Sequence, residues 1–210
     1  MSTSARLLLV RHGQTVWHRE NRYAGGGSDI DLTAAGVAQA ADLARWAKEA
    51  DPTAVVSSPV RRALETARPA AAALGLELQV EPDLREVSFG IAEGRTMAEL
   101  LASHPDTARA FQADPVRHPF PGAEAPDLAA ARAAAALRRT ATAHQEGTVL
   151  VVAHNTLLRL ALCELLRIGV HRYRQVFPRL DNAAVTELRV PVDPDEPCSL
   201  ISLNVPVTCP

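Results

Sequence analysis

Short, unbroken runs of apolar residues alternate with longer segments of helical periodicity over the first eighty positions. The apolar runs are residues 7–10, 54–57 and 76–80, and their continuous character is typical of strands buried on both faces of a parallel sheet. Between them, residues 33–50 and 59–74 have the length and spacing of helices. The order strand, helix, strand, helix, strand predicts an α/β fold with helices on both faces of the sheet.

Local signals fix the ends of these two helices. Thr33 is a typical N-cap, Pro59 suits a first helical turn, and Gly75 suits a helix stop. For the first helix we expect an apolar face made of Val37, Ala40, Ala41, Ala44 and Ala47.

The middle of the chain, residues 81–126, breaks this pattern. It is rich in proline and offers only two short helical candidates, near 96–103 and 106–113. We interpret it as an inserted lid rather than a linker, because its loops carry aromatic rings that need a surface to cover: Phe89, Phe111 and Phe120.

The α/β pattern resumes after this segment. A helix at about 127–145, a strand at 148–153 and a helix at 154–168 precede two late strands at 183–190 and 199–205. We therefore expect one domain over 1–210. Its fold class is α/β, a three-layer sandwich with a mostly parallel central sheet, helices on both faces and the lid inserted at about 81–126.

Composition and charge narrow the possible partners. The 210 residues are 47% hydrophobic and 22% charged, with a formal net charge of −2. This balance argues against a surface built to hold nucleic acid or anionic lipid, so we expect neither a nucleic-acid nor a membrane partner. Lys48 is the single lysine, and no Gly-Lys-Ser or Gly-Lys-Thr sequence occurs, which excludes a Walker-type phosphate loop.

The N-terminal residues show no targeting segment. Six residues precede only four apolar ones, 7–10, which is too short for a signal-peptide core. We therefore expect a cytoplasmic protein. The oligomeric state stays open, with a homodimer formed through the late strands as one option.

Polar residues follow three of the expected strands. Arg11 and His12 follow the first strand, Arg62 lies in the first turn of the helix after the second, and His154 follows the strand at 148–153. In an open α/β sheet the carboxyl ends of the strands are the usual place for a site. We expect two imidazoles and at least two guanidinium groups to meet there.

This set of side chains suits a phosphoryl group. Guanidinium forks match its oxygens with paired, charge-assisted hydrogen bonds, and helix N-termini add free N–H groups. A neutral imidazole is a nucleophile that can carry the group covalently. Taken singly, each residue has a plainer interpretation, since a histidine at a strand end is commonly a rim residue and an arginine pair a solvated face. The functional interpretation rests on their shared location at the carboxyl ends of the expected strands.

At this level of detail the chain resembles the histidine phosphatase superfamily, the phosphoglycerate-mutase-like enzymes. The matching segments occur in the family's order: residues 8–17 (LLVRHGQTVW), 21–25 (NRYAG), 57–67 (SSPVRRALETA), 84–94 (LREVSFGIAEG) and 151–155 (VVAHN). The resemblance implies that His12 is the nucleophile, that Arg11 and Arg62 bind phosphoryl oxygens, and that His154 completes the pocket. It also places the proton donor at Glu86 and implies no cofactor and no metal.

The resemblance further implies a set of substrate contacts: Arg11, Thr15, His18, Ala24, Gly25, Arg62 and Asn155. Two of these depart from the family pattern. His18 stands where many relatives carry Asn, and Asn155 stands where Gly is common. Both departures bear on which substrate fits the site, and neither removes a catalytic group.

Three functions stay open at this point. The first is a metal-independent phosphomonoesterase acting on a small phosphorylated metabolite through a phosphohistidine. The second is a phosphoglycerate mutase, although the acid region lacks the Glu-Arg-His-Tyr run that mutases tend to show. The third is a non-catalytic domain that recognises phosphate, which is disfavoured because every chemical role has a residue.

Overall fold

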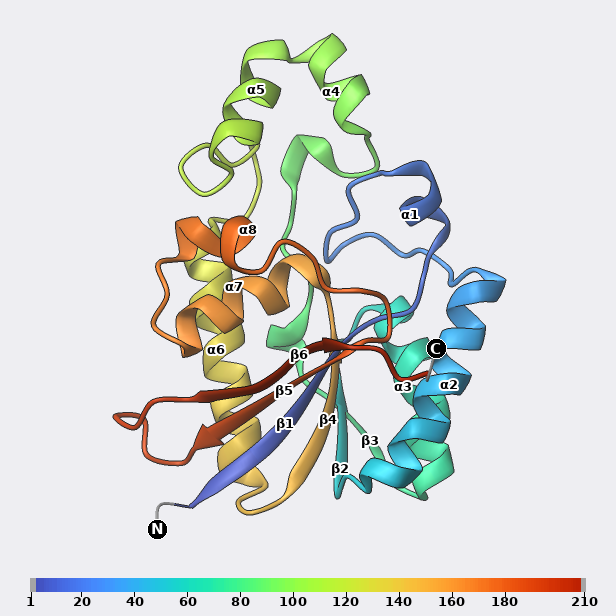
Figure 1. Ribbon diagram of the computed structural model, residues 1–210. Helices are drawn as coiled ribbons and strands as arrows, with labels where there is room; N and C mark the ends of the chain where they lie inside the picture. Colours follow the sequence, from blue (N-terminus) through green and yellow to red (C-terminus); the bar gives the residue numbers. More distant parts are fainter. Residues whose placement is uncertain (1–2, 209–210) are drawn as a thin grey trace.

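A mixed six-stranded sheet in the order β3-β2-β4-β1-β5-β6 organises the computed structural model, which describes residues 3–208 (Figure 1). The first four strands in this order pair in parallel, whereas β5 and β6 are added antiparallel. The predicted α/β class with a mostly parallel sheet is therefore confirmed. The bounds of the strands are β1 Ser4–Arg11, β2 Ala54–Ser57, β3 Leu78–Val80, β4 Thr148–Ala153, β5 Val185–Pro191 and β6 Ser199–Val205.

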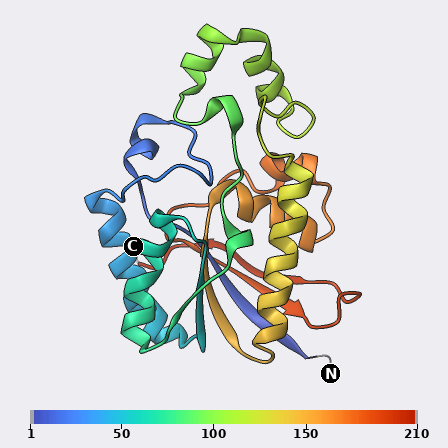
Figure 2. The same ribbon diagram turned by 180° about the vertical axis from the view of Figure 1, so that it is seen from behind.

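Helices cover both faces of this sheet. On one face lie α2 (Ala34–Ala50) and α3 (Arg61–Leu74), and on the other lie α6 (Pro126–Ala143) and α7 (Asn155–Leu165) (Figures 1 and 2). Alternate residues of β1 separate the two cores, because successive side chains of a strand point to opposite faces. Leu8 packs in the α2–α3 core, whereas Leu7 packs in the α6–α7 core.

Above the carboxyl edge of the sheet, α4 (Met97–Ser103) and α5 (Pro105–Ala113) form a separate cap (Figure 1). The three phenylalanines expected to need cover are buried together in a third apolar cluster, where the rings of Phe111 and Phe120 stack 4.0 Å apart. That residues 81–126 act as a lid, and that 1–210 form one domain, stay predictions; positions 1–2 and 209–210 lie outside the described residues.

The expected apolar face of α2 is partly wrong. Ala40, Ala44 and Ala47 are buried as expected, but Val37 is 59% exposed and Ala41 is exposed as well. Gly36 and Leu43 take their places in the buried stripe of α2.

Several short elements had no signal in the apolar pattern. They are the helices α1 (Val16–Glu20) and α8 (Tyr173–Val176), and the 3₁₀ turns Pro82–Leu84, Gly90–Ala92 and Val170–Arg172. None of the helices within residues 3–208 combines the length and apolar character that a membrane crossing needs.

Candidate active site

The predicted site residues meet at the carboxyl edge of the sheet because β2, β4 and β1 are neighbours. The backbone N–H of His12 donates to the carbonyl of Ala153 at 3.0 Å, just beyond the last pairing of β1 with β4. The N–H of Ser58 donates in the same way to Val152, at 2.9 Å. His12, Ser58 and His154 therefore extend three adjacent strands into one pocket.

The imidazole of His12 is almost completely buried, with 4% exposed. Its Nδ1 lies 2.8 Å from the carbonyl oxygen of Gly13, and its Nε2 lies 3.1 Å from the Nε of Arg62. Because a guanidinium only donates and a carbonyl only accepts, Nδ1 carries the proton and Nε2 holds a lone pair. Burial, together with the charge of Arg62 and the proximity of His154, lowers the pKa of His12 well below its usual range. The ring is therefore neutral at pH 7.

Arg62 is held in place by backbone carbonyls on a single loop. Its guanidinium donates to the carbonyls of Ser28 (2.9 Å), Gly25 (3.1 Å) and Ala24 (3.2 Å), while its Nε faces His12. The side chain is 1% exposed. Ala24 and Gly25, which were expected to contact substrate, here position the arginine through their carbonyls.

Arg11 and His18 meet at a second corner of the pocket. A terminal nitrogen of Arg11 lies 2.6 Å from the Nε2 of His18, and the backbone N–H of Thr15 donates to the Nδ1 of His18 at 2.9 Å. Burial and the charges of Arg11 and Arg62 lower the pKa of His18 to about 3. A neutral imidazole accepts at only one nitrogen, so one of these two contacts brings two N–H donors face to face.

His154 is fully buried beside His12, with the two ring centroids 5.1 Å apart. Burial and the charges of Arg62 and Arg11 lower the pKa of His154 well below its usual range, so this ring is neutral as well. Within the described residues, its Nδ1 is a buried atom with no hydrogen-bond partner.

The carboxylate of Glu86 lies at the N-terminus of α7. Its carboxylate accepts from the backbone N–H groups of Val87 (2.9 Å), Leu157 (2.9 Å) and Thr156 (3.1 Å). Burial nevertheless raises its pKa, against the lowering effect of these N–H groups and of Arg62. The raised pKa is the property that a carboxyl needs in order to hold a proton near neutral pH.

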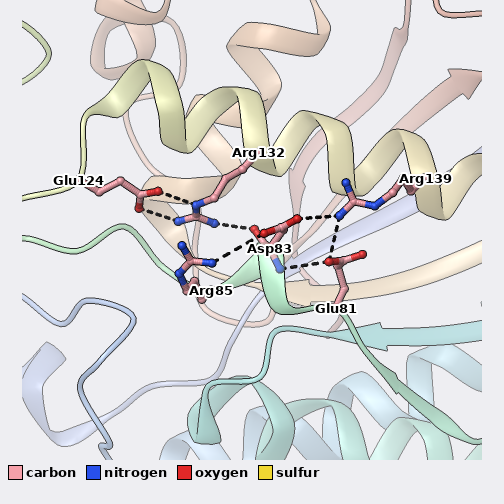
Figure 3. Close-up of polar contacts among 6 residues, drawn as sticks. All are labelled: Glu81, Asp83, Arg85, Glu124, Arg132 and Arg139. Atoms are coloured by element: carbon pink, nitrogen blue, oxygen red, sulfur yellow. Dashed lines mark hydrogen bonds and ion pairs between the residues drawn. The ribbon is translucent and has the colours of Figure 1, made fainter.

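An ion-pair network fixes the backbone that carries Glu86 (Figure 3). Arg132 of α6 binds Glu124 through both carboxylate oxygens, at 2.6 and 2.8 Å, and also donates to the carbonyl of Asp83 at 2.5 Å. Arg139, about two turns further along the same face of α6, pairs with Glu81 and Asp83. The segment before Glu86 is thereby tied to α6 and, through Arg132, to Glu124.

Two further predicted contacts have structural partners in this arrangement. Asn155 accepts the N–H of Leu180 at 3.3 Å through its Oδ1, and Arg11 donates to the carbonyl of the same Leu180 at 2.7 Å. Thr15 is fully buried as the N-cap of α1. Whether these side chains also touch substrate stays a prediction.

Sequence reasoning missed the residues whose side chains hold the backbone and the loop around these site residues. Thr66 accepts the N–H of Gly13 at 2.9 Å, and Asn182 donates to the carbonyl of His12 at 2.8 Å. Glu93 accepts from Gly25 and Ser28 and so holds the loop that binds Arg62. The matched segments contain Thr66 and Glu93, but only the fold shows their partners.

Side chains that could bind a metal ion are not clustered within the described residues. Among residues 3–208, no cluster of three or more His, Cys, Asp or Glu side chains has the arrangement needed to hold a metal ion.

Comparison with known proteins assigns the class. Residues 7–197 match the model of the histidine phosphatase superfamily (branch 1). Phosphoserine phosphatase 1 of Hydrogenobacter thermophilus is 30% identical over 168 residues, which cover 80% of this chain and 79% of that protein. A mycobacterial glucosyl-3-phosphoglycerate phosphatase, solved in complex with VO3, superposes with a TM-score of 0.85 at 28% identity, covering 95% of this chain and 99% of the other.

Other relatives are longer. A bifunctional protein of Mycobacterium tuberculosis is 41% identical over 165 residues, and these make up 76% of this chain but only 45% of that protein. The match of the family model over residues 7–197 decides the assignment: the chain belongs to the histidine phosphatase superfamily, as an enzyme of the histidine phosphatase type. The family and enzyme class predicted from the sequence motifs are confirmed.

Proposed function

We propose that this protein hydrolyses the phosphomonoester of a small metabolite by transferring the phosphoryl group first to His12 and then to water. The observation that supports this most directly is the state of His12. Its ring is neutral, its Nδ1–H donates to the Gly13 carbonyl, and its Nε2 keeps the lone pair, which accepts from the Nε–H of Arg62. A neutral imidazole with a fixed tautomer is ready to attack phosphorus.

In the first step the Nε2 lone pair attacks phosphorus and the ester P–O bond breaks. The departing alkoxide takes the proton of Glu86, whose raised pKa keeps it protonated more readily than an exposed carboxyl. In the second step a water oxygen attacks phosphorus while Glu86 accepts its proton. The P–N bond then breaks and returns the lone pair to Nε2.

The pocket stabilises the charge on the transferred group by fixed donors. Arg62 and Arg11 are both held by backbone carbonyls, so little reorganisation is needed when charge develops. Burial lowers the pKa of Arg11 to about 10, which still leaves it charged at pH 7. Where the Nδ1 of His18 accepts from Thr15, its Nε2–H faces Arg11, and a phosphoryl oxygen bound beside both would accept from each of them.

The two phosphatases compared above favour a small phosphorylated acid as substrate. Phosphoserine and glucosyl-3-phosphoglycerate, which appear in the names of the two phosphatases compared above, share a phosphate ester and a carboxylate. The lid residues Arg117 and His118 are exposed in the loop after α5, and Arg117 pairs with Asp114.

Replacement of the nucleophile is the first test. His12→Ala should abolish hydrolysis of p-nitrophenyl phosphate, and the wild-type enzyme quenched with acid-free denaturant should carry an acid-labile phosphoryl group at His12. Retained turnover in the variant would remove the covalent route. Incubation with phosphoglycerate separates the alternatives, since release of inorganic phosphate marks a hydrolase and sustained isomerisation marks a mutase.

A further inference from the structure

Ser58 is a buried hydroxyl in contact with the second histidine of the pocket. It directly follows β2, is fully buried, and its Oγ lies 2.7 Å from the Nε2 of His154. His154 directly follows β4, the neighbour of β2 in the sheet. The contact therefore results from the parallel pairing of two strands, and both ends of it are fixed by backbone.

The hydrogen-bond partners of Ser58 decide the direction of this contact. The Oγ already accepts from the backbone N–H of Val60 at 3.2 Å. Among the described residues, the acceptor within reach of the hydroxyl proton is the Nε2 of His154. A buried hydroxyl proton without an acceptor is costly, so Ser58 donates and Nε2 of His154 accepts.

This direction fixes the tautomer of His154. The ring is neutral, because burial and the charges of Arg62 and Arg11 lower its pKa, and a neutral imidazole carries a single N–H. With Nε2 accepting, the proton lies on Nδ1. This is the same Nδ1 that is buried without a partner among the described residues, on a ring that lies next to the ring of His12.

We propose that Ser58 is a positioning residue that holds His154 as its Nδ1–H tautomer, so that Nδ1 donates to the phosphoryl group transferred at His12. The assignment rests on the proposed function for its ligand, but the tautomer itself is a property of the free enzyme. In the opposite tautomer a lone pair on Nδ1 would face the phosphoryl oxygens. The donor would be lost and a repulsion gained.

The chain offers a matched control for Ser58 in its neighbour Ser57. Both hydroxyls are fully buried, but Ser57 donates to the carbonyl of Ser58 at 3.0 Å and to neither histidine. Ser58→Ala and Ser57→Ala therefore remove the same atom from adjacent buried positions. Only the first variant frees His154 to exchange its proton between the two nitrogens.

The experiment reads the tautomer and the rate separately. The ¹⁵N spectrum of histidine-labelled, ligand-free enzyme distinguishes protonated from unprotonated ring nitrogens, and His154→Gln assigns the signals. We expect Nδ1–H in the wild type and in Ser57→Ala, and a shift towards Nε2–H in Ser58→Ala. The value of kcat with an alkyl phosphate should fall on the order of 100-fold in Ser58→Ala, the typical loss of one pre-positioned donor, and stay near wild type in Ser57→Ala.

Either of two results would overturn the proposal. One is a wild-type spectrum that shows the proton on Nε2 of His154. This measurement does not depend on the folding of any variant. The other is a Ser58→Ala enzyme that loses no more activity than Ser57→Ala. A failure to trap phosphohistidine would instead count against the proposed function, because the spectrum is recorded without substrate.

Discussion

Replacing Glu86 by Gln should separate proton donation from phosphoryl binding. The substitution keeps the shape of the side chain and removes the acidic proton. General acid catalysis typically contributes about 10²–10⁴-fold in rate. For an alkyl phosphate, whose alkoxide leaves only when protonated, we expect kcat/KM to fall by roughly this factor, equivalent to about 3–5 kcal/mol of transition-state free energy. For p-nitrophenyl phosphate the loss should be much smaller, because p-nitrophenolate leaves with little protonation.

The hydrogen bonds that Glu86 accepts determine how much this substitution also destabilises the folded protein. The Oε1 accepts two backbone N–H groups, from Val87 and Leu157, and a glutamine oxygen can keep both. The Oε2 accepts the N–H of Thr156, and there the amide group of Gln would present a second donor. The variant should lose about 1–3 kcal/mol of unfolding free energy, the usual cost of one unmade buried hydrogen bond.

The assay compares the two substrates at fixed pH in three enzymes. Glu93→Gln is the matched control, because Glu93 also accepts three hydrogen bonds but holds the loop under Arg62. It should slow both substrates by the same factor, since it acts on phosphoryl binding alone. Equal losses for the two substrates in Glu86→Gln would show that another group protonates the leaving oxygen.

Three further outcomes follow from the structure. Burial and the neighbouring charges lower the pKa of His18 to about 3 from an ordinary value of 6.5, so the unfolded chain gains a proton as pH falls below about 6.5 while the folded protein does not. Urea unfolding should therefore show stability falling towards pH 5.5, and His18→Asn should reduce that slope by about 1 kcal/mol per pH unit; an unchanged slope would be the contrary result. Gly36→Ala would drive a Cβ into the carbonyl oxygen of Gln14, so denaturant melts should report a loss of about 1–3 kcal/mol, and wild-type stability would contradict the close approach. Arg132→Met leaves the half-buried carboxylate of Glu124 without its bidentate partner, so the unfolding free energy of this variant should fall by about 2 kcal/mol. If the lost pair is the cause, adding Glu124→Gln in a double variant should restore most of that loss.

The apolar pattern predicted the elements well where a strand or helix is buried as a unit. All four parallel strands and the four helices that cover the sheet lie where their patterns place them, because a continuous apolar run or a long stripe has few other solutions. The strand expected at 76–80 begins at Leu78, since Leu76 and Glu77 belong to the turn after α3. The short α1 and α8 have too few turns to produce a stripe.

The face of α2 shows why a pattern of small residues can mislead. Its alanines occur on every side, so several stripes of similar hydrophobicity are available along Ala34–Ala50. Packing selects the stripe that contains Gly36, because the backbone of α2 must approach Gly13 and Gln14 closely. Leu43 then turns into the core and Val37 turns to solvent. This close approach is a property of the assembled site and leaves no trace in local periodicity.

Motif reasoning grouped His12, Arg62 and His154, which the structure brings together, but it could not provide their protonation states. The sequence shows that His12, His18 and His154 are present, and nothing in it says which ring nitrogen carries a proton. Those states follow from partners far away along the chain: Arg62 for His12, and Ser58 for His154. Tautomers depend on such partners because a neutral imidazole donates and accepts at different atoms.

Arg62, Arg11 and Glu86 are each fixed by the backbone of a different segment. Carbonyls of the 24–28 loop hold Arg62, the carbonyl of Leu180 holds Arg11, and the N-terminus of α7 holds Glu86. Since these supports come from separate segments, a substitution in one should weaken a single group and leave the others in place. Losses from Glu93→Gln and Glu86→Gln should therefore be nearly additive in free energy, whereas Glu93→Gln and Arg62→Met, which share a support, should fall well short of additivity.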